Sequence, residues 1–179
     1  MTSVERGPMS APKRVPGPMD ERTGALLMLN GGGLLCLAVV VGWIWFFATL
    51  GRVVLWPLPI DIPVAIPGDA RAWRMAHMEG ITHGLLLIGL AAGGRFLLLT
   101  ERQFRWLLGS ALTSAWLFTV PAVLNALFET RGLAMGGGPF GPSLANDLIY
   151  LAGWPPVVAV HVALALLVLG AVRKAKRAA

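Results

Sequence analysis

Four long apolar runs limit what this 179-residue chain can fold into. They cover about residues 25–50, 73–99, 104–128 and 148–172, and each is long enough to cross a bilayer as one helix. The composition agrees, because 56% of the residues are hydrophobic, 13% are charged and the mean hydropathy is +0.69. The sequence therefore predicts an all-α integral membrane protein, a four-helix bundle.

Basic residues are unevenly distributed among the segments that flank these runs. Eleven of the fifteen Lys and Arg residues lie in the N-terminal segment, in the loop from Arg95 to Arg105 and in the C-terminal segment. The positive-inside rule then places both termini in the cytoplasm, which agrees with an even number of spans. We predict a disordered cytoplasmic tail over residues 1–23, which is rich in Pro, Gly and charge, a four-span domain over 24–172 and a basic cytoplasmic tail over 173–179.

Several classes of function find no support. The formal charge of +6 comes from residues at the ends of apolar runs rather than from a basic stripe, so no nucleic-acid partner is predicted. The single cysteine, Cys36, excludes a disulfide framework. No HExxH, Walker loop, GxSxG or CxxC motif is present.

The connector from Gly51 to Ala70 holds four prolines, so we expect an extended segment on the membrane surface, with Asp69 as the N-cap of the second helix.

The stretch PGDARAWRMAHMEGITHG, residues 67–84, gathers charge, an aromatic ring and two of the three histidines beside an apolar helix. Trp73 and His77 are four residues apart and share a helix face. Imidazole suits iron and guanidinium clamps carboxylates, so His77 with Arg71 and Arg74 would suit the iron and carboxylates of a haem. A membrane anchor of interfacial His, Trp and Arg explains the same residues and is the more common case.

Two further features carry polar groups into the spans. Glu79 and His83 are four apart and predict a hydrogen-bonded pair, either functional or mutually satisfied. His83 lies roughly 240° around the helix from His77, so the two imidazoles do not bind one metal from the same side. Pro121 and Asn125 predict a kink with a hydrogen-bonding amide, next to a site or as an ordinary membrane kink.

Three motifs, in this order, resemble the bacterial styrene oxide isomerase family. They are the stretch over residues 67–84, LLGS ending at Ser110, and RGLAMGGGPFGP from Arg131 to Pro142. Members of that family are small four-span membrane enzymes that convert an aryl epoxide to the aldehyde. The resemblance runs from the first apolar run to the fourth.

The resemblance implies a haem b at the interfaces of a homotrimer in the bacterial inner membrane, with His77 as the axial ligand. The iron would act as a Lewis acid on a small apolar epoxide, and a 1,2-hydride shift would give the carbonyl. On this basis we expect Trp73, Arg71, Arg74 and Arg131 to bind the cofactor, and His83 and Asn125 to be catalytic. For each arginine, charge pairing with Asp61 or Asp69 is the alternative.

The chain also departs from the family pattern. His83 stands where the family has an asparagine, Val123 lies near the place of its tyrosine and Ala115 near that of its aspartate. The only tyrosine is Tyr150. Two other functions therefore stay open: a haem protein for electron transfer or gas sensing, and a bundle without haem whose histidines, including His161, are polar contacts.

Overall fold

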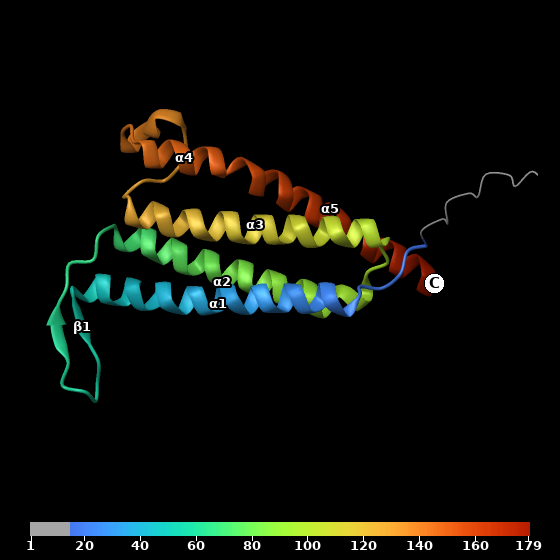
Figure 1. The fold of residues 1–179 in the computed structure, drawn as a ribbon, viewed down its shortest axis with the longest axis horizontal. Coiled ribbons are helices and arrows are strands. Elements are labelled where there is room, and N and C mark those ends of the chain that lie inside the picture. Colours follow the sequence, from blue (N-terminus) through green and yellow to red (C-terminus); the bar gives the residue numbers. More distant parts are fainter. Residues whose placement is uncertain (1–14) are drawn as a thin grey trace, which may run out of the picture.

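The computed structural model describes residues 15–179, and within them four apolar helical segments are long enough to span a membrane (Figure 1). Helix α1 covers Glu21–Leu50, α2 covers Ala70–Gly93 and continues as the short 3-10 helix η1, Gly94–Phe96, and α3 covers Glu101–Leu127. The fourth segment is divided at Gly153 into α4, Leu144–Ala152, and α5, Trp154–Ala178. The predicted all-α four-helix membrane bundle is confirmed. Residues 1–14 of the predicted tail lie outside the described residues.

Side-chain caps decide where the helices begin. The Asp20 carboxylate accepts from the Thr23 amide at 2.9 Å, so α1 begins inside the stretch that the sequence assigned to the tail. Asp69 caps α2 as predicted, accepting from the Arg71 amide at 3.2 Å. Thr100 and Gln103 form a reciprocal capping box at the start of α3.

The helices pack mainly in chain order, and α1 also contacts α3, where the Trp116 indole donates to the Asn30 side chain at 3.0 Å. Helix α1 packs on α2, α2 on α3 and α3 on α5, as Figure 1 shows. The contact of α1 with α2 is built from glycines: a Cβ added at Gly31 would lie 2.8 Å from the Gly84 carbonyl oxygen, and one at Gly80 would lie 2.9 Å from the Ala38 Cβ. In a bilayer the hydrophobic effect does not drive helices together, so they associate through close packing, which small residues allow.

The connector between α1 and α2 is a two-stranded hairpin. Strand β1, Arg52–Val54, pairs antiparallel with β2, Asp61–Pro63, and the Arg52 Nε lies 2.9 Å from the Asp61 carboxylate. The hairpin projects from the end of α1 away from the helices (Figure 1). Trp56, in its turn, is 89% exposed. The extended, non-helical connector was predicted, but the strand pairing was not.

The opposite end of the bundle carries both ends of the described chain (Figure 1). There Gly17 and Leu99 exchange two backbone hydrogen bonds of 3.0 and 3.1 Å, and the Leu98 amide donates to the Gly170 carbonyl at 3.1 Å. Helix α5 continues through most of the predicted basic tail, and Arg173 donates to the Gln103 side chain at 2.8 Å. Both ends on one side agree with an even number of spans.

Candidate functional site

His77 is held from one side by α1. Its Nδ1 lies 2.8 Å from the Ala38 carbonyl oxygen. A carbonyl oxygen only accepts, so Nδ1 carries the proton in this contact and Nε2 keeps its lone pair. The ring also sits against Gly42, where an added Cβ would lie 2.9 Å from both Cε1 and Nδ1 of His77. The centroids of the His77 and Trp45 rings are 5.9 Å apart. The imidazole is thus fixed in position with its other nitrogen available.

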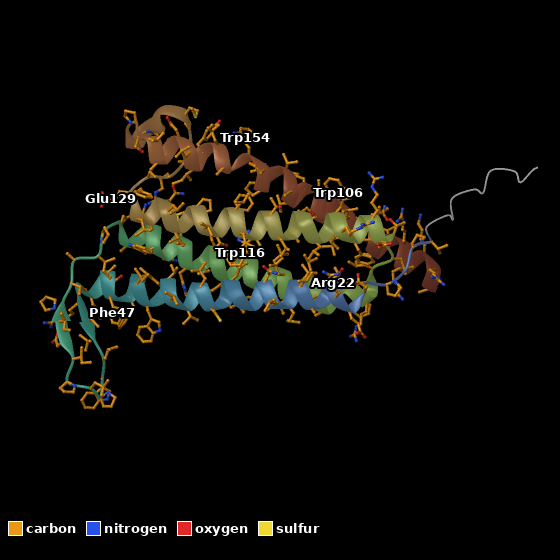
Figure 2. All side chains as sticks on the ribbon, in the orientation of Figure 1. Arg22, Phe47, Trp106, Trp116, Glu129 and Trp154 are labelled. Atoms are coloured by element: carbon orange, nitrogen blue, oxygen red, sulfur yellow. The ribbon has the colours of Figure 1, made fainter. Side chains whose placement is uncertain are left out.

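His77 lines an apolar hollow of about 560 Å³ on the surface of α1, which we call the α1 groove. Its other lining residues all come from α1: Val39, Gly42, Trp43, Trp45, Phe46, Thr49 and Leu50. Trp43 is 53% exposed in the single chain, so the groove is open to its surroundings. Figure 2 shows the neighbouring Phe47 projecting outward from the same helix.

The donor chemistry of the α1 groove suits haem better than a bare metal ion. No group of three or more His, Cys, Asp or Glu residues that could hold a metal ion is found in the described part of the chain. A bare ion needs several protein ligands, whereas haem iron already has four ring nitrogens and takes one axial histidine from the protein. One imidazole with a free Nε2 on an apolar wall meets that need.

The other residues expected at the cofactor do not line the α1 groove. Trp73 is 1% exposed, and its indole N–H donates to the Pro67 carbonyl at 2.9 Å, so it serves the core between α1, α2 and α3. Arg131 Nη2 lies 3.2 Å from the Asp69 carboxylate, which is the charge pairing expected as the alternative. Arg71 and Arg74 are exposed on the first turns of α2.

His83 lies elsewhere on α2 and is 9% exposed. Its Nδ1 is 3.0 Å from the Glu79 carbonyl oxygen and 3.2 Å from the Glu79 carboxylate. Its ring stacks on Phe118 of α3, with centroids 5.5 Å apart. The predicted Glu79–His83 pair is confirmed. The structure does not bring it into the α1 groove of the same chain.

Asn125 lines a second hollow of about 500 Å³, which we call the inner cavity; it lies between α2, α3, α4 and the start of α5 and is open on one side, where the lining residue Trp154 is 56% exposed. Its wall is largely apolar, with four polar side chains: Glu79, Asn125, Arg131 and Tyr150. Figure 2 shows Trp154, another lining residue, on the side of the bundle away from α1. The Asn125 Oδ1 is buried and has no hydrogen-bond partner. The sequence signalled this region only through Pro121 and Asn125.

The loop between α3 and α4 is organised by Asn146. This side chain is fully buried; its Oδ1 accepts from the Thr130 hydroxyl at 2.9 Å and the Gly132 amide at 3.0 Å, and its Nδ2 donates to the Ala134 carbonyl at 2.7 Å. These hydrogen bonds join the first residues of the loop to α4, and Gly132 and Leu133 form part of the inner cavity wall.

Sequence reasoning missed the support that α1 gives to His77. The signal was present, because Ala38 and Gly42 are small residues four apart on a helix. His161, for which the sequence suggested a polar contact, is exposed on α5, and its Nδ1 lies 2.6 Å from the Val157 carbonyl oxygen of its own helix.

Comparison with known proteins adds one finding. A family model described as styrene oxide isomerase matches residues 23–172, which include all four apolar helices except the ends of α1 and α5. No curated protein matches the chain.

Proposed function

The chain belongs to the styrene oxide isomerase family, and on that premise we propose that it isomerises a small apolar epoxide to a carbonyl compound, using a haem b held by His77. The observation that carries this proposal is His77 on the wall of the α1 groove with its Nδ1 bound to the Ala38 carbonyl, which leaves Nε2 as the ring nitrogen outside that contact. The reactant and product have the same atoms, so the reaction needs no external oxidant or reductant.

Each neighbour of His77 has a distinct task. When bound, the haem supplies a Lewis acid for the epoxide oxygen, whose charge grows as the ring opens. The Ala38 carbonyl fixes the tautomer and orientation of the imidazole and raises its basicity as a ligand. Gly42 leaves the space that the ring occupies, because a Cβ there would lie 2.9 Å from it.

The walls of the α1 groove suit the apolar ring of a haem held by His77. Val39, Trp43 and Phe46 present hydrocarbon and aromatic surface to it. Exclusion of water matters because water would add to the opened epoxide and give a diol instead of a carbonyl compound.

The other residues expected at the haem and the substrate would meet them only in an assembly of several copies of the chain. We propose a homotrimer in the bacterial inner membrane, both termini cytoplasmic, with the haem between neighbouring chains. The open side of the α1 groove supports such an interface. Arg71 and Arg74 would then pair with haem carboxylates. His83 on α2 and Asn125 on α3 would be the catalytic side chains.

The absorbance spectrum of the detergent-purified protein tests the proposal. We expect a Soret band in the wild type that His77→Ala abolishes. His83→Ala removes an imidazole from the same helix and is the matched control, which should keep the band. The wild type should then convert styrene oxide to the aldehyde. A normal Soret band in His77→Ala, or a colourless wild type from haem-replete cells, would overturn the haem assignment.

One observation favours a second candidate, a haem protein for electron transfer or sensing. The family's tyrosine is absent, with Val123 near its place, and the only tyrosine, Tyr150, lines the inner cavity rather than the α1 groove. Reversible redox cycling of the Soret band without epoxide turnover would support this candidate.

A further inference from the structure

We propose that the face shared by α3 and α5 binds one anionic phospholipid, with its phosphate at two arginines and an acyl chain in an apolar groove. Two adjoining hollows carry this inference. The first, the arginine hollow, has a volume of about 330 Å³ and is lined by Arg102, Arg105 and Trp106. The second, the α3–α5 groove, has a volume of about 530 Å³ and shares Trp106 with the first. The proposal needs only that these helices span a membrane, and it does not rest on isomerase activity.

The arginine hollow has the chemistry of a phosphate site. Arg102 and Arg105 are three residues apart on α3, so they share a helix face. Guanidinium groups match phosphate oxygens with pairs of hydrogen bonds. Among the described residues, no carboxylate lies within 4.0 Å of Arg102, and only Glu101 approaches Arg105, at 3.6 Å between two exposed side chains. An exposed pair at this distance is weak, so it competes little with a phosphate.

The charge at this end of the bundle also favours an anion. Residues 20–22, 95–105 and 173–179 lie at the end that carries both ends of the described chain (Figure 1), and they hold eight basic and three acidic side chains. Basic residues next to a membrane span attract anionic headgroups. A zwitterionic headgroup carries no net charge and gains less from them. The partner expected here is therefore an anionic lipid.

Trp106 marks the boundary between the two hollows. It is 59% exposed, and Figure 2 shows it beside α5, toward the end of the bundle that carries both ends of the described chain. Tryptophan is enriched at the depth where headgroups meet hydrocarbon, because it combines an apolar ring system with one N–H donor. A phosphate at the arginines then lies on the polar side of Trp106, and the acyl chain lies on the other side.

The α3–α5 groove suits a hydrocarbon chain. Its lining residues are spaced three or four apart on each helix, so each helix contributes one face. The α3 face runs from Trp106 to Thr113, about 10 Å along the helix axis. The hydroxyl of Ser110, which lies between them, donates to the Trp106 carbonyl of its own helix at 2.6 Å and needs no partner from a ligand.

Gly109 gives the groove its depth. A Cβ added at this position would meet no protein atom within 4 Å, and the residue is exposed. The space beside Gly109 is therefore open to the bilayer and is not filled by the bundle. A larger side chain at this position would occupy the groove in place of a lipid chain.

Native mass spectrometry of the full-length protein in detergent tests the proposal. The two probes are dioleoyl phosphatidylglycerol, which is anionic, and dioleoyl phosphatidylcholine, which carries the same acyl chains on a zwitterionic headgroup. We expect one phosphatidylglycerol per chain, bound at least about tenfold more tightly than phosphatidylcholine. Glycerol phosphate, which has the charge without the chains, should fail to displace it.

Charge-matched variants separate a site from general attraction. The double variant Arg102→Gln/Arg105→Gln should weaken phosphatidylglycerol binding about 25-fold, or about fivefold for each arginine. Arg95→Gln/Arg177→Gln is the matched control, because it removes the same charge from the same end and neither residue lines the arginine hollow. The control should stay within about twofold of the wild type, since solvent and salt screen charges outside the site.

Gly109→Leu tests the apolar half of the site. The leucine should occupy the groove and lower the affinity for phosphatidylglycerol about fivefold, because the acyl chain loses its close contacts there. Gly89→Leu is the matched control: Gly89 is exposed on α2, lines neither hollow, and a Cβ there also meets nothing within 4 Å. It should bind phosphatidylglycerol as the wild type does.

Three results would overturn the proposal. The first is equal affinity of the wild type for phosphatidylglycerol and phosphatidylcholine, which needs no variant. The second is an equal loss of binding in the two double arginine variants, which would show attraction by net charge alone. The third is displacement of the lipid by glycerol phosphate, which would leave a phosphate site without an acyl chain. None of these measurements depends on haem or on epoxide turnover.

Discussion

The two faces of α2 are packed in different ways. Toward α1, glycines bring the helices so close that added Cβ atoms at Gly31, Gly80 and Gly84 would lie within 2.9 Å of neighbouring atoms. Toward α3 and α4, larger side chains leave the inner cavity of about 500 Å³. The described residues contain two buried side-chain oxygens without partners, Thr119 Oγ1 and Asn125 Oδ1, and both are on α3. The close contact holds one imidazole in place, whereas the open one leaves volume and unsatisfied polar atoms.

The largest effect is expected where the close contact is tightest. Gly31→Ala puts a Cβ 2.8 Å from the Gly84 carbonyl and the Ile88 side chain, so it should destabilise the fold by about 1–3 kcal/mol through overpacking. Gly32→Ala is the matched control, since its Cβ meets nothing within 4 Å, and it should gain about 0.5–1 kcal/mol from lower backbone entropy in the unfolded chain. Thermal unfolding in detergent measures both. Equal stability of the two variants would refute the packing difference.

The next effect concerns the haem ligand. Gly42→Ala would push the His77 ring from its place, because the new Cβ lies 2.9 Å from Cε1 and Nδ1. Changes to groups that support a metal ligand typically cost about 10–100-fold in affinity, and we expect about 10-fold here. Haem titration followed at the Soret band measures it, with Gly33→Ala as the control on the same helix, where nothing lies within 4 Å. Unchanged haem affinity in Gly42→Ala would show that Gly42 does not support the ligand.

A smaller effect of opposite sign is expected on α3. Thr119→Val removes the partnerless hydroxyl and should stabilise the protein by up to about 1 kcal/mol. Ser114→Ala is the contrasting change, because the buried Ser114 hydroxyl donates to the Ala111 carbonyl at 3.0 Å, and its loss should destabilise by about 0.5–1.5 kcal/mol. Unfolding midpoints compare them. If both variants shift in the same direction, Thr119 has a partner in solution.

The smallest effect lies outside both contacts, at the start of α1. Hydrogen bonds from the Thr23 hydroxyl and amide hold the pKa of Asp20 below its usual value of 3.8. Because the folded state lowers this pKa, the contribution is complete above 3.8 and disappears as the pH falls through the lowered value. Acid titration of Thr23→Val against wild type should show a weaker loss of stability below this pH in the variant. Identical acid profiles would remove this role from Thr23.

Local rules account for what the sequence predicted. Hydropathy located the four spans, Asp69 was recognisable as a cap, and the spacing of Glu79 and His83 predicted their contact. The rest depends on how particular helices face one another. The contact of His77 with Ala38 needs the rotation of α2 against α1, and the inner cavity needs the separation of α2 from α4 and α5. Neither the rotation nor the separation is encoded within a single helix.

The hydrogen bonds around Leu98 and Leu99 have a mechanical consequence. They join the N-terminal segment at Gly17 to α5 at Gly170 through the short connection between α2 and α3. The helices are thereby tied at the end that carries both termini, while the inner cavity lies toward the other end. The backbone hydrogen bonds therefore brace the bundle at one end, and the inner cavity near Asn125 and Arg131 lies beyond the reach of this brace.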